Sequence, residues 1–177
     1  KVLDCSMNIK INDTDHLSNT LEELYCHNGF CFDDEEVGIC QKSISNLNSL
    51  KILDCADNYE INNVNHLANT LEDLRCGELC GIDQNGISGL KILKSLDCSN
   101  NNEIKDVNHL AETLIKLDCE GSCGIDQNGI SQLINLKRLD CVNNKKIKDV
   151  RHLTKTLEIL RCNGKNIDKN ICPFLTD

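Results

Sequence analysis

The sequence predicts a stacked repeat solenoid, in which short parallel strands are joined by return segments of helix-like spacing. Three observations predict it: a motif that occurs eight times, nearly constant spacing between its copies, and a longer pattern that recurs every 43 residues. The motif is Leu-x-Cys, beginning at Leu3, Leu24, Leu53, Leu74, Leu96, Leu117, Leu139 and Leu160. Successive leucines lie 21, 29, 21, 22, 21, 22 and 21 residues apart.

Each motif predicts a strand of only a few residues, with leucine and cysteine on its buried face. In one form of the repeat an asparagine follows three residues after the cysteine, where its amide can bond the backbone of a chain leaving the strand. The return stretch has helix-like apolar spacing, as in Val107, Leu110 and Leu114, and predicts a short helix or 3₁₀ turns. The asparagines are Asn8, Asn58, Asn101 and Asn144.

A second form of the repeat alternates with the first, and two together make the 43-residue unit. The second form has Leu79 or Ser122 at the asparagine position and a cysteine one residue later, Cys80 or Cys123. We interpret these cysteines as turn residues of a loop that is one residue longer. The 29-residue step is a repeat with an insertion of about seven residues within 27–37, which holds two phenylalanines and four consecutive acids.

The stretch Leu-Lys-Arg-Leu-Asp-Cys-Val-Asn-Asn at 136–144 resembles the leucine-rich-repeat pattern L-x-x-L-x-[L/C]-x-x-[N/C]. In-phase copies cover essentially the whole chain. The resemblance implies an α/β fold, a right-handed leucine-rich-repeat solenoid with a curved parallel sheet on the concave face and short helices or 3₁₀ turns on the convex face. It predicts a single domain over 1–177 with about eight repeats of 21–22 residues. Neither end resembles a cap, so we expect a fragment of a longer protein or ends covered by a partner or a second copy.

Composition narrows the class of partner. The net charge is -9, from 19 basic and 28 acidic residues. Nucleic acids and anionic membranes attract a basic surface, so neither is expected to bind, and a basic protein partner fits better. No stretch approaches the roughly 18 apolar residues of a membrane span.

The 13 cysteines first suggest a secreted disulfide framework. Eight of them, however, hold one inward-facing repeat position. Neighbouring side chains in a parallel ladder run alongside rather than toward one another, which disfavours bridges. We therefore predict reduced, buried thiols in the cytoplasm or another reducing intracellular compartment, that of a host cell included.

Residues that flank the leucine on each strand should point outward on the concave face. Asp97, Asp118 and Asp140 should stack as a like-charge column, which Lys116 and Arg138 could offset. Two interpretations stay open: a solvated face with local salt links, or an acidic stripe that binds a basic partner. The insertion likewise has two interpretations: it is either an interaction loop or a loop whose phenylalanines pack over the N-terminal repeats. The candidate partner-binding residues are Tyr25, Phe30, Phe32, Asp54, Arg75, Asp97, Lys116, Asp118, Arg138, Asp140 and Arg161.

Metal and cofactor sites are not predicted. The repeated histidines occur only in alternate repeats, about 10 Å apart on the ladder spacing, whereas zinc bonds are about 2 Å long. We therefore expect a structural role for them at the start of each convex segment. The pairs Cys76/Cys80 and Cys119/Cys123 fit the repeat pattern, and His27 with Cys26 and Cys31 is only a weak cluster. The histidines in question are His16, His66, His109 and His152.

No catalytic motif is recognisable, and the spacing Gly124-x-x-x-x-Gly129 lacks the lysine of a phosphate-binding loop. The sequence therefore predicts a non-enzymatic module for protein–protein interaction, which recognises its partner through the concave face and the 27–37 insertion. The alternative is a structural module that self-assembles into a homo-oligomer by stacking its uncapped terminal repeats.

Overall fold

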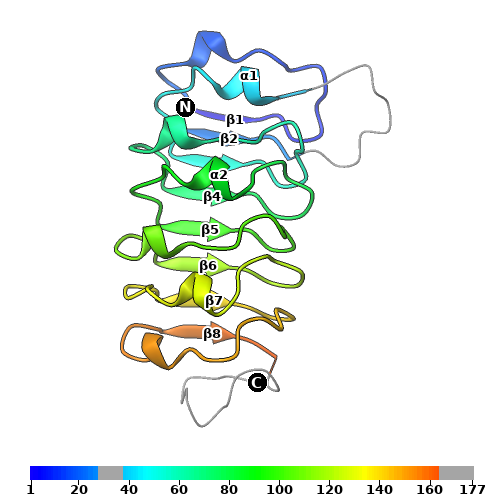
Figure 1. The fold of residues 1–177 in the computed structure, drawn as a ribbon. Coiled ribbons are helices and arrows are strands. Elements are labelled where there is room, and N and C mark those ends of the chain that lie inside the picture. Colours follow the sequence, from blue (N-terminus) through cyan, green and yellow to red (C-terminus); the bar gives the residue numbers. More distant parts are fainter. Residues whose placement is uncertain (28–37, 164–177) are drawn as a thin grey trace.

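The computed structural model describes residues 1–27 and 38–163, which form one eight-stranded parallel sheet (Figure 1). The strands neighbour one another in chain order, and one helical turn stands in each connection between them. The strands are β1 (Val2–Asp4), β2 (Glu23–Tyr25), β3 (Ile52–Asp54), β4 (Asp73–Arg75), β5 (Ser95–Asp97), β6 (Lys116–Asp118), β7 (Arg138–Asp140) and β8 (Ile159–Arg161). The helical turns are η1 (Asp15–Leu17), α1 (Gln41–Ile44), η2 (Asn65–Leu67), α2 (Gln84–Ile87), η3 (Asn108–Leu110), η4 (Asn128–Ile130) and η5 (Arg151–Leu153).

The predicted repeat solenoid is confirmed by the register of the strands. Each motif leucine pairs with the motif leucine of the next repeat, as Leu74 does with Leu96. A leucine at the centre of a three-residue strand points to one side, while its two neighbours point to the other. From β2 to β8 these leucines are fully or almost fully buried, and together with the motif cysteines they form a continuous core along the stack.

The asparagines that follow the motif cysteine join consecutive repeats, as the sequence suggested. The Asn101 Nδ2 amide donates to the backbone carbonyls of Cys76 at 2.9 Å and Ile82 at 3.0 Å, both in the preceding repeat. Its Oδ1 accepts from the Glu103 backbone N–H at 3.0 Å. Three hydrogen bonds satisfy this buried amide, which therefore closes the turn and connects two layers at once. The same set of bonds recurs at Asn58 and Asn144.

The return segments differ between the two forms because their first residues differ. In three of the four first-form repeats a valine precedes the 3₁₀ turn and makes no side-chain cap, as at Val107 before η3. In the second form an aspartate side chain accepts from the backbone near the turn start: Asp83 Oδ1 from Gly86 N–H, and Asp126 Oδ1 from Gly129 N–H. Such capping satisfies a backbone N–H group at the start of the turn. The expectation of short helices or 3₁₀ turns is confirmed.

Glycines of the second form lie where two layers approach closely. A Cβ built on Gly124 would collide with the carbonyl oxygen of Ile104, and one built on Gly129 would collide with that of Lys105. Only a residue without Cβ allows this contact. The Gly-x-x-x-x-Gly spacing is therefore explained by packing between repeats.

Of the eleven cysteines that the structure describes, nine are buried. Cys80 and Cys123 lie inside their turns with backbone and core around them, as the interpretation of a lengthened loop predicted. Within the described ranges, no helix is long and apolar enough to cross a membrane.

Candidate functional site

One regular surface of the molecule is the side of the sheet that carries the two outward positions of each strand, here called the open sheet face. Because the strands pair in register, these positions form two columns across the sheet. Seven of the sixteen residues are acidic and four are basic. The face consists of Val2, Asp4, Glu23, Tyr25, Ile52, Asp54, Asp73, Arg75, Ser95, Asp97, Lys116, Asp118, Arg138, Asp140, Ile159 and Arg161.

Ion pairs within and between strands offset much of the expected like-charge column. Asp118 lies between the Lys116 Nζ, 2.7 Å from its Oδ2, and the Arg138 Nε, 3.7 Å from its Oδ1. The Arg161 Nη1 lies 3.5 Å from the Asp140 Oδ2. The predicted compensation by Lys116 and Arg138 is thus present at Asp118.

Two of the three stacked aspartates are buried rather than presented to solvent. Asp140 is only 2% exposed and Asp118 only 9% exposed, while Asp97 is partly exposed. Asp97 accepts from the Ser99 backbone N–H at 3.1 Å. Buried charges are costly unless they are paired, so we assign Asp118 and Asp140 a structural role within the sheet. Of the three stacked aspartates, a partner can therefore reach only Asp97. The exposed guanidinium groups of Arg75 on β4 and Arg161 on β8 lie on either side of the three aspartates and can also be reached.

A further carboxyl group, which sequence reasoning missed, lies beside the aspartates. Burial raises the pKa of Glu120, and the charge and hydrogen-bonding capacity of the neighbouring Asp140 carboxyl group act in the same direction. Asp118 and Asp97 contribute in the same direction. Glu120 stands one residue after Cys119, where strand alternation would have placed it on the outward side. The open sheet face therefore holds a local excess of negative charge at β5 to β7.

The N-terminal part of the face is more apolar. Val2 is 62% exposed, and Tyr25 and Ile52 are partly exposed on the next two strands. The Tyr25 hydroxyl donates to the Glu23 Oε2 at 3.1 Å, which holds the ring in place. An aromatic ring with a fixed polar end is a common anchor in protein interfaces. Phe30 and Phe32 of the insertion lie outside the described residues.

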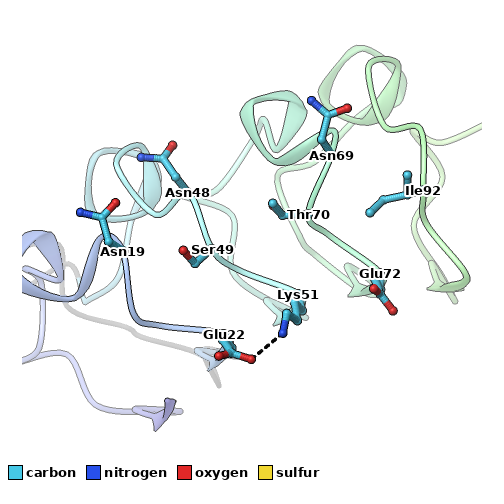
Figure 2. A pocket seen from close by; sticks show the side chains of 9 residues that line it. All are labelled: Asn19, Glu22, Asn48, Ser49, Lys51, Asn69, Thr70, Glu72 and Ile92. Atoms are coloured by element: carbon cyan, nitrogen blue, oxygen red, sulfur yellow. Dashed lines mark hydrogen bonds and ion pairs between the residues drawn. The ribbon is translucent and has the colours of Figure 1, made fainter.

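Figure 2 shows a shallow groove on the side of the stack where return segments re-enter the strands. Its volume is about 390 Å³. The Lys51 Nζ pairs with the Glu22 Oε2 at 2.7 Å at the strand side, and amide side chains project from the return segments. The lining residues are Asn19, Glu22, Asn48, Ser49, Lys51, Asn69, Thr70, Glu72 and Ile92.

An equivalent groove of about 450 Å³ lies between later repeats, where the Lys137 Nζ pairs with the Glu158 Oε1 at 2.8 Å. Its recurrence shows that the groove is a product of the repeat geometry. Both grooves are open, and each contains one lysine–glutamate ion pair. Small-molecule sites are typically enclosed and mostly apolar, so the grooves fit solvent or a protein surface better than a small ligand.

The repeated histidines bond to the backbone of the preceding repeat. The Nε2 atoms of His66, His109 and His152 lie 3.0, 3.1 and 2.9 Å from the carbonyl oxygens of residues 44, 87 and 130 respectively. Each histidine lies within a 3₁₀ turn, which supports the structural role that the sequence suggested. In the described part of the chain, no three His, Cys, Asp or Glu side chains are grouped as metal ligands would be.

Comparison with known proteins adds no relative. No protein-family model matches the chain, and no curated protein matches it. The structure and the repeat pattern therefore support membership of the solenoid repeat class, which rests on the eight parallel strands and their regular spacing.

Proposed function

We propose that this chain is a leucine-rich-repeat module that recognises a protein partner through the open sheet face, without catalytic activity of its own. In this proposal the solenoid is right-handed and the open sheet face is its concave side. The observation that carries the proposal is the ordered surface itself: eight short strands present two in-register columns of charged and apolar side chains. Extended concave surfaces of solenoids are suited to binding other proteins.

The distribution of side chains favours a basic partner that contacts the N-terminal and central strands. Val2, Tyr25 and Ile52 offer apolar contact, and Asp4 and Asp97 offer charge that no ion pair among the described residues neutralises. Rim charges chiefly accelerate association and set specificity, while buried aromatic and apolar anchors provide most of the binding energy. We therefore assign affinity to the region around Tyr25 and selectivity for positive charge to the aspartates.

A peptide-selection experiment tests this assignment. Peptides are selected from a random display library on the wild-type protein, and their binding is then measured to Tyr25→Ala and to the double variant Asp4→Asn/Asp97→Asn. The asparagines keep an oxygen for the Ser6 and Ser99 backbone N–H groups, so the turns stay intact. Enrichment of basic sequences that bind both variants at least tenfold more weakly supports the proposal.

The control is Glu103→Lys, because Glu103 is an exposed acid in a turn away from the open sheet face. Peptides that bind Glu103→Lys as weakly as the sheet variants would place recognition elsewhere. Selection of acidic sequences, or equal binding to all variants, would contradict the proposal.

The alternative function is assembly through the first repeat, and one observation favours it. Leu3, Ile11 and Leu17 are partly exposed, whereas their counterparts Leu53, Ile61 and Leu67 are fully buried under a preceding repeat. We propose a second copy as the occupant of this end. Sedimentation velocity over a hundredfold concentration range tests it: self-association that Ile11→Lys abolishes is expected, and a monomer at every concentration would rule it out.

The proposed setting is a reducing intracellular compartment, because burial of free thiols removes them from a disulfide network. A thiol count on the purified, denatured protein under non-reducing conditions checks this part of the proposal.

A further inference from the structure

Two pairs of cysteines are in sulfur–sulfur contact inside the stack. The Sγ atoms of Cys55 and Cys80 lie 3.7 Å apart, and those of Cys98 and Cys123 lie 3.6 Å apart. Each pair joins the motif cysteine of one repeat to the turn cysteine of the next, and the two pairs are 43 residues apart in sequence. The arrangement is therefore a feature of the repeated unit.

Motif cysteines in register run alongside one another, which disfavours bridges among them. The turn cysteine differs because the loop of the second form carries one more residue and directs its side chain back toward the neighbouring layer. A disulfide has an S–S length of about 2.05 Å. Each pair is thus about 1.6 Å from bonding distance, a gap that side-chain rotation and small backbone shifts can close.

The environment makes the turn cysteine the more nucleophilic member of each pair. A hydrogen bond from the Cys55 thiol lowers the pKa of Cys80 against the opposing effect of burial, and the backbone of Ile82 contributes in the same sense. The pKa of Cys123 is lowered in the same way by Cys98 and by the backbone of residue 125. The thiolate is the reactive form of cysteine, so each pair holds a nucleophile beside a thiol that can resolve it.

The two pairs differ in access from solvent. Cys80 is 8% exposed and follows Glu78 and Leu79, two exposed residues at the tip of the turn. Cys98 and Cys123 are both fully buried. An oxidant can therefore reach Cys80 from the surface, whereas the second pair requires the turn to open first.

We propose that the pairs Cys55/Cys80 and Cys98/Cys123 are two dithiol modification sites that hydroperoxides oxidise to disulfides between neighbouring repeats. The turn thiolate attacks a peroxide oxygen and becomes a sulfenic acid, while the peroxide O–O bond breaks and, with hydrogen peroxide, one water forms. The motif thiol then attacks that sulfur, the S–S bond forms, and the second water leaves. In total two thiols lose two electrons and two protons, and one peroxide is reduced to two waters.

The test treats the folded, reduced protein with hydrogen peroxide, blocks the remaining thiols under denaturing conditions, and maps cross-linked tryptic peptides by mass spectrometry. Trypsin separates Cys55 in 52–75 from Cys80 in 76–91, and Cys98 in 95–105 from Cys123 in 117–137. We expect a loss of two thiols per pair, with the 52–75/76–91 link forming before the 95–105/117–137 link. Dithiothreitol should restore both pairs of thiols.

Single substitutions assign the bonded cysteines. Cys80→Ala should abolish the first link, and its control Cys76→Ala, which removes the other cysteine of the same peptide, should leave it unchanged. Circular dichroism confirms that each variant is folded. Links that survive Cys80→Ala, links that form only in denaturant, or oxidation of single cysteines to sulfinic acid without a bridge would each overturn the proposal. Because the readout is covalent, it does not depend on the identity of the binding partner.

Discussion

The buried asparagine of the first repeat form offers the sharpest test of how the layers are joined. We predict that Asn101→Ala lowers the free energy of unfolding by about 3 kcal/mol. The substitution removes three hydrogen bonds of 2.9, 3.0 and 3.0 Å, two of them to the preceding repeat. A buried polar group left without a partner costs about 1–3 kcal/mol. The substitution leaves two carbonyl groups and one backbone N–H group without this partner. At about 1 kcal/mol for each group, the low end of that range, the total is about 3 kcal/mol.

Asn8 provides a matched control within the same chain. It occupies the same repeat position, its Oδ1 accepts from the Lys10 backbone N–H at 3.0 Å, and it is exposed. Asn8→Ala therefore loses an exposed local bond while the bonds between layers remain. Exposed substitutions usually change stability by no more than about 0.5 kcal/mol. The difference between the two variants isolates the connection between repeats.

Urea titration followed by circular dichroism measures both variants. With an m-value of about 3 kcal/mol/M, Asn101→Ala should lower the midpoint by about 1 M, and Asn8→Ala should lower it by less than about 0.2 M. Because repeat arrays can unfold in parts, hydrogen exchange at β4 and β5 should report the same loss locally. Midpoints that agree within about 0.3 M would refute the account of asparagine as the connection between layers.

Three further predictions concern packing and pH. Gly129→Ala should destabilise the protein by about 2 kcal/mol or more, because its Cβ would collide with the Lys105 carbonyl, and calorimetry should show a lower Tm. Burial and Asp140 raise the pKa of Glu120, so this carboxyl stabilises the fold at acid pH and loses that contribution as pH rises through its folded pKa. Glu120→Gln should therefore raise Tm at pH 7 but not at pH 4, and an equal shift at both values would count against a raised pKa of Glu120. Burial lowers the pKa of His66, so its contribution is present above the unfolded value and is lost as pH falls through the folded one. Tm should consequently fall between pH 7 and pH 5 by a smaller amount in His66→Gln than in the wild type.

The strand positions and the turn asparagines could be predicted well from the sequence. Leu-x-Cys at constant spacing allows one arrangement in which leucine and cysteine are buried and the intervening residue is outside. Asn58 follows the same rule: an amide at the exit of a strand is most simply explained by hydrogen bonds to backbone groups. These inferences succeeded because they depend on local geometry that every repeat shares.

The outward face was predicted less completely. Asp97, Asp118 and Asp140 look equivalent in sequence, but only Asp97 keeps exposed surface. The difference arises from neighbours 20 or more residues away, such as Arg161 beside Asp140. A long side chain can reach several partners across the sheet, and the partner that it contacts depends on distances in three dimensions.

The sequence by itself determined that the chain is a stack of eight short parallel strands, because a period of 21–22 residues with a two-residue apolar alternation is the signature of a stacked solenoid. Only the tertiary structure decided which side chains meet between layers. The contact of Cys55 with Cys80 and the collision that Gly129 avoids depend on how one loop lies over the next. The physical reason is that the spacing along the chain sets which repeat a residue belongs to, whereas the lateral offset between layers sets what it touches.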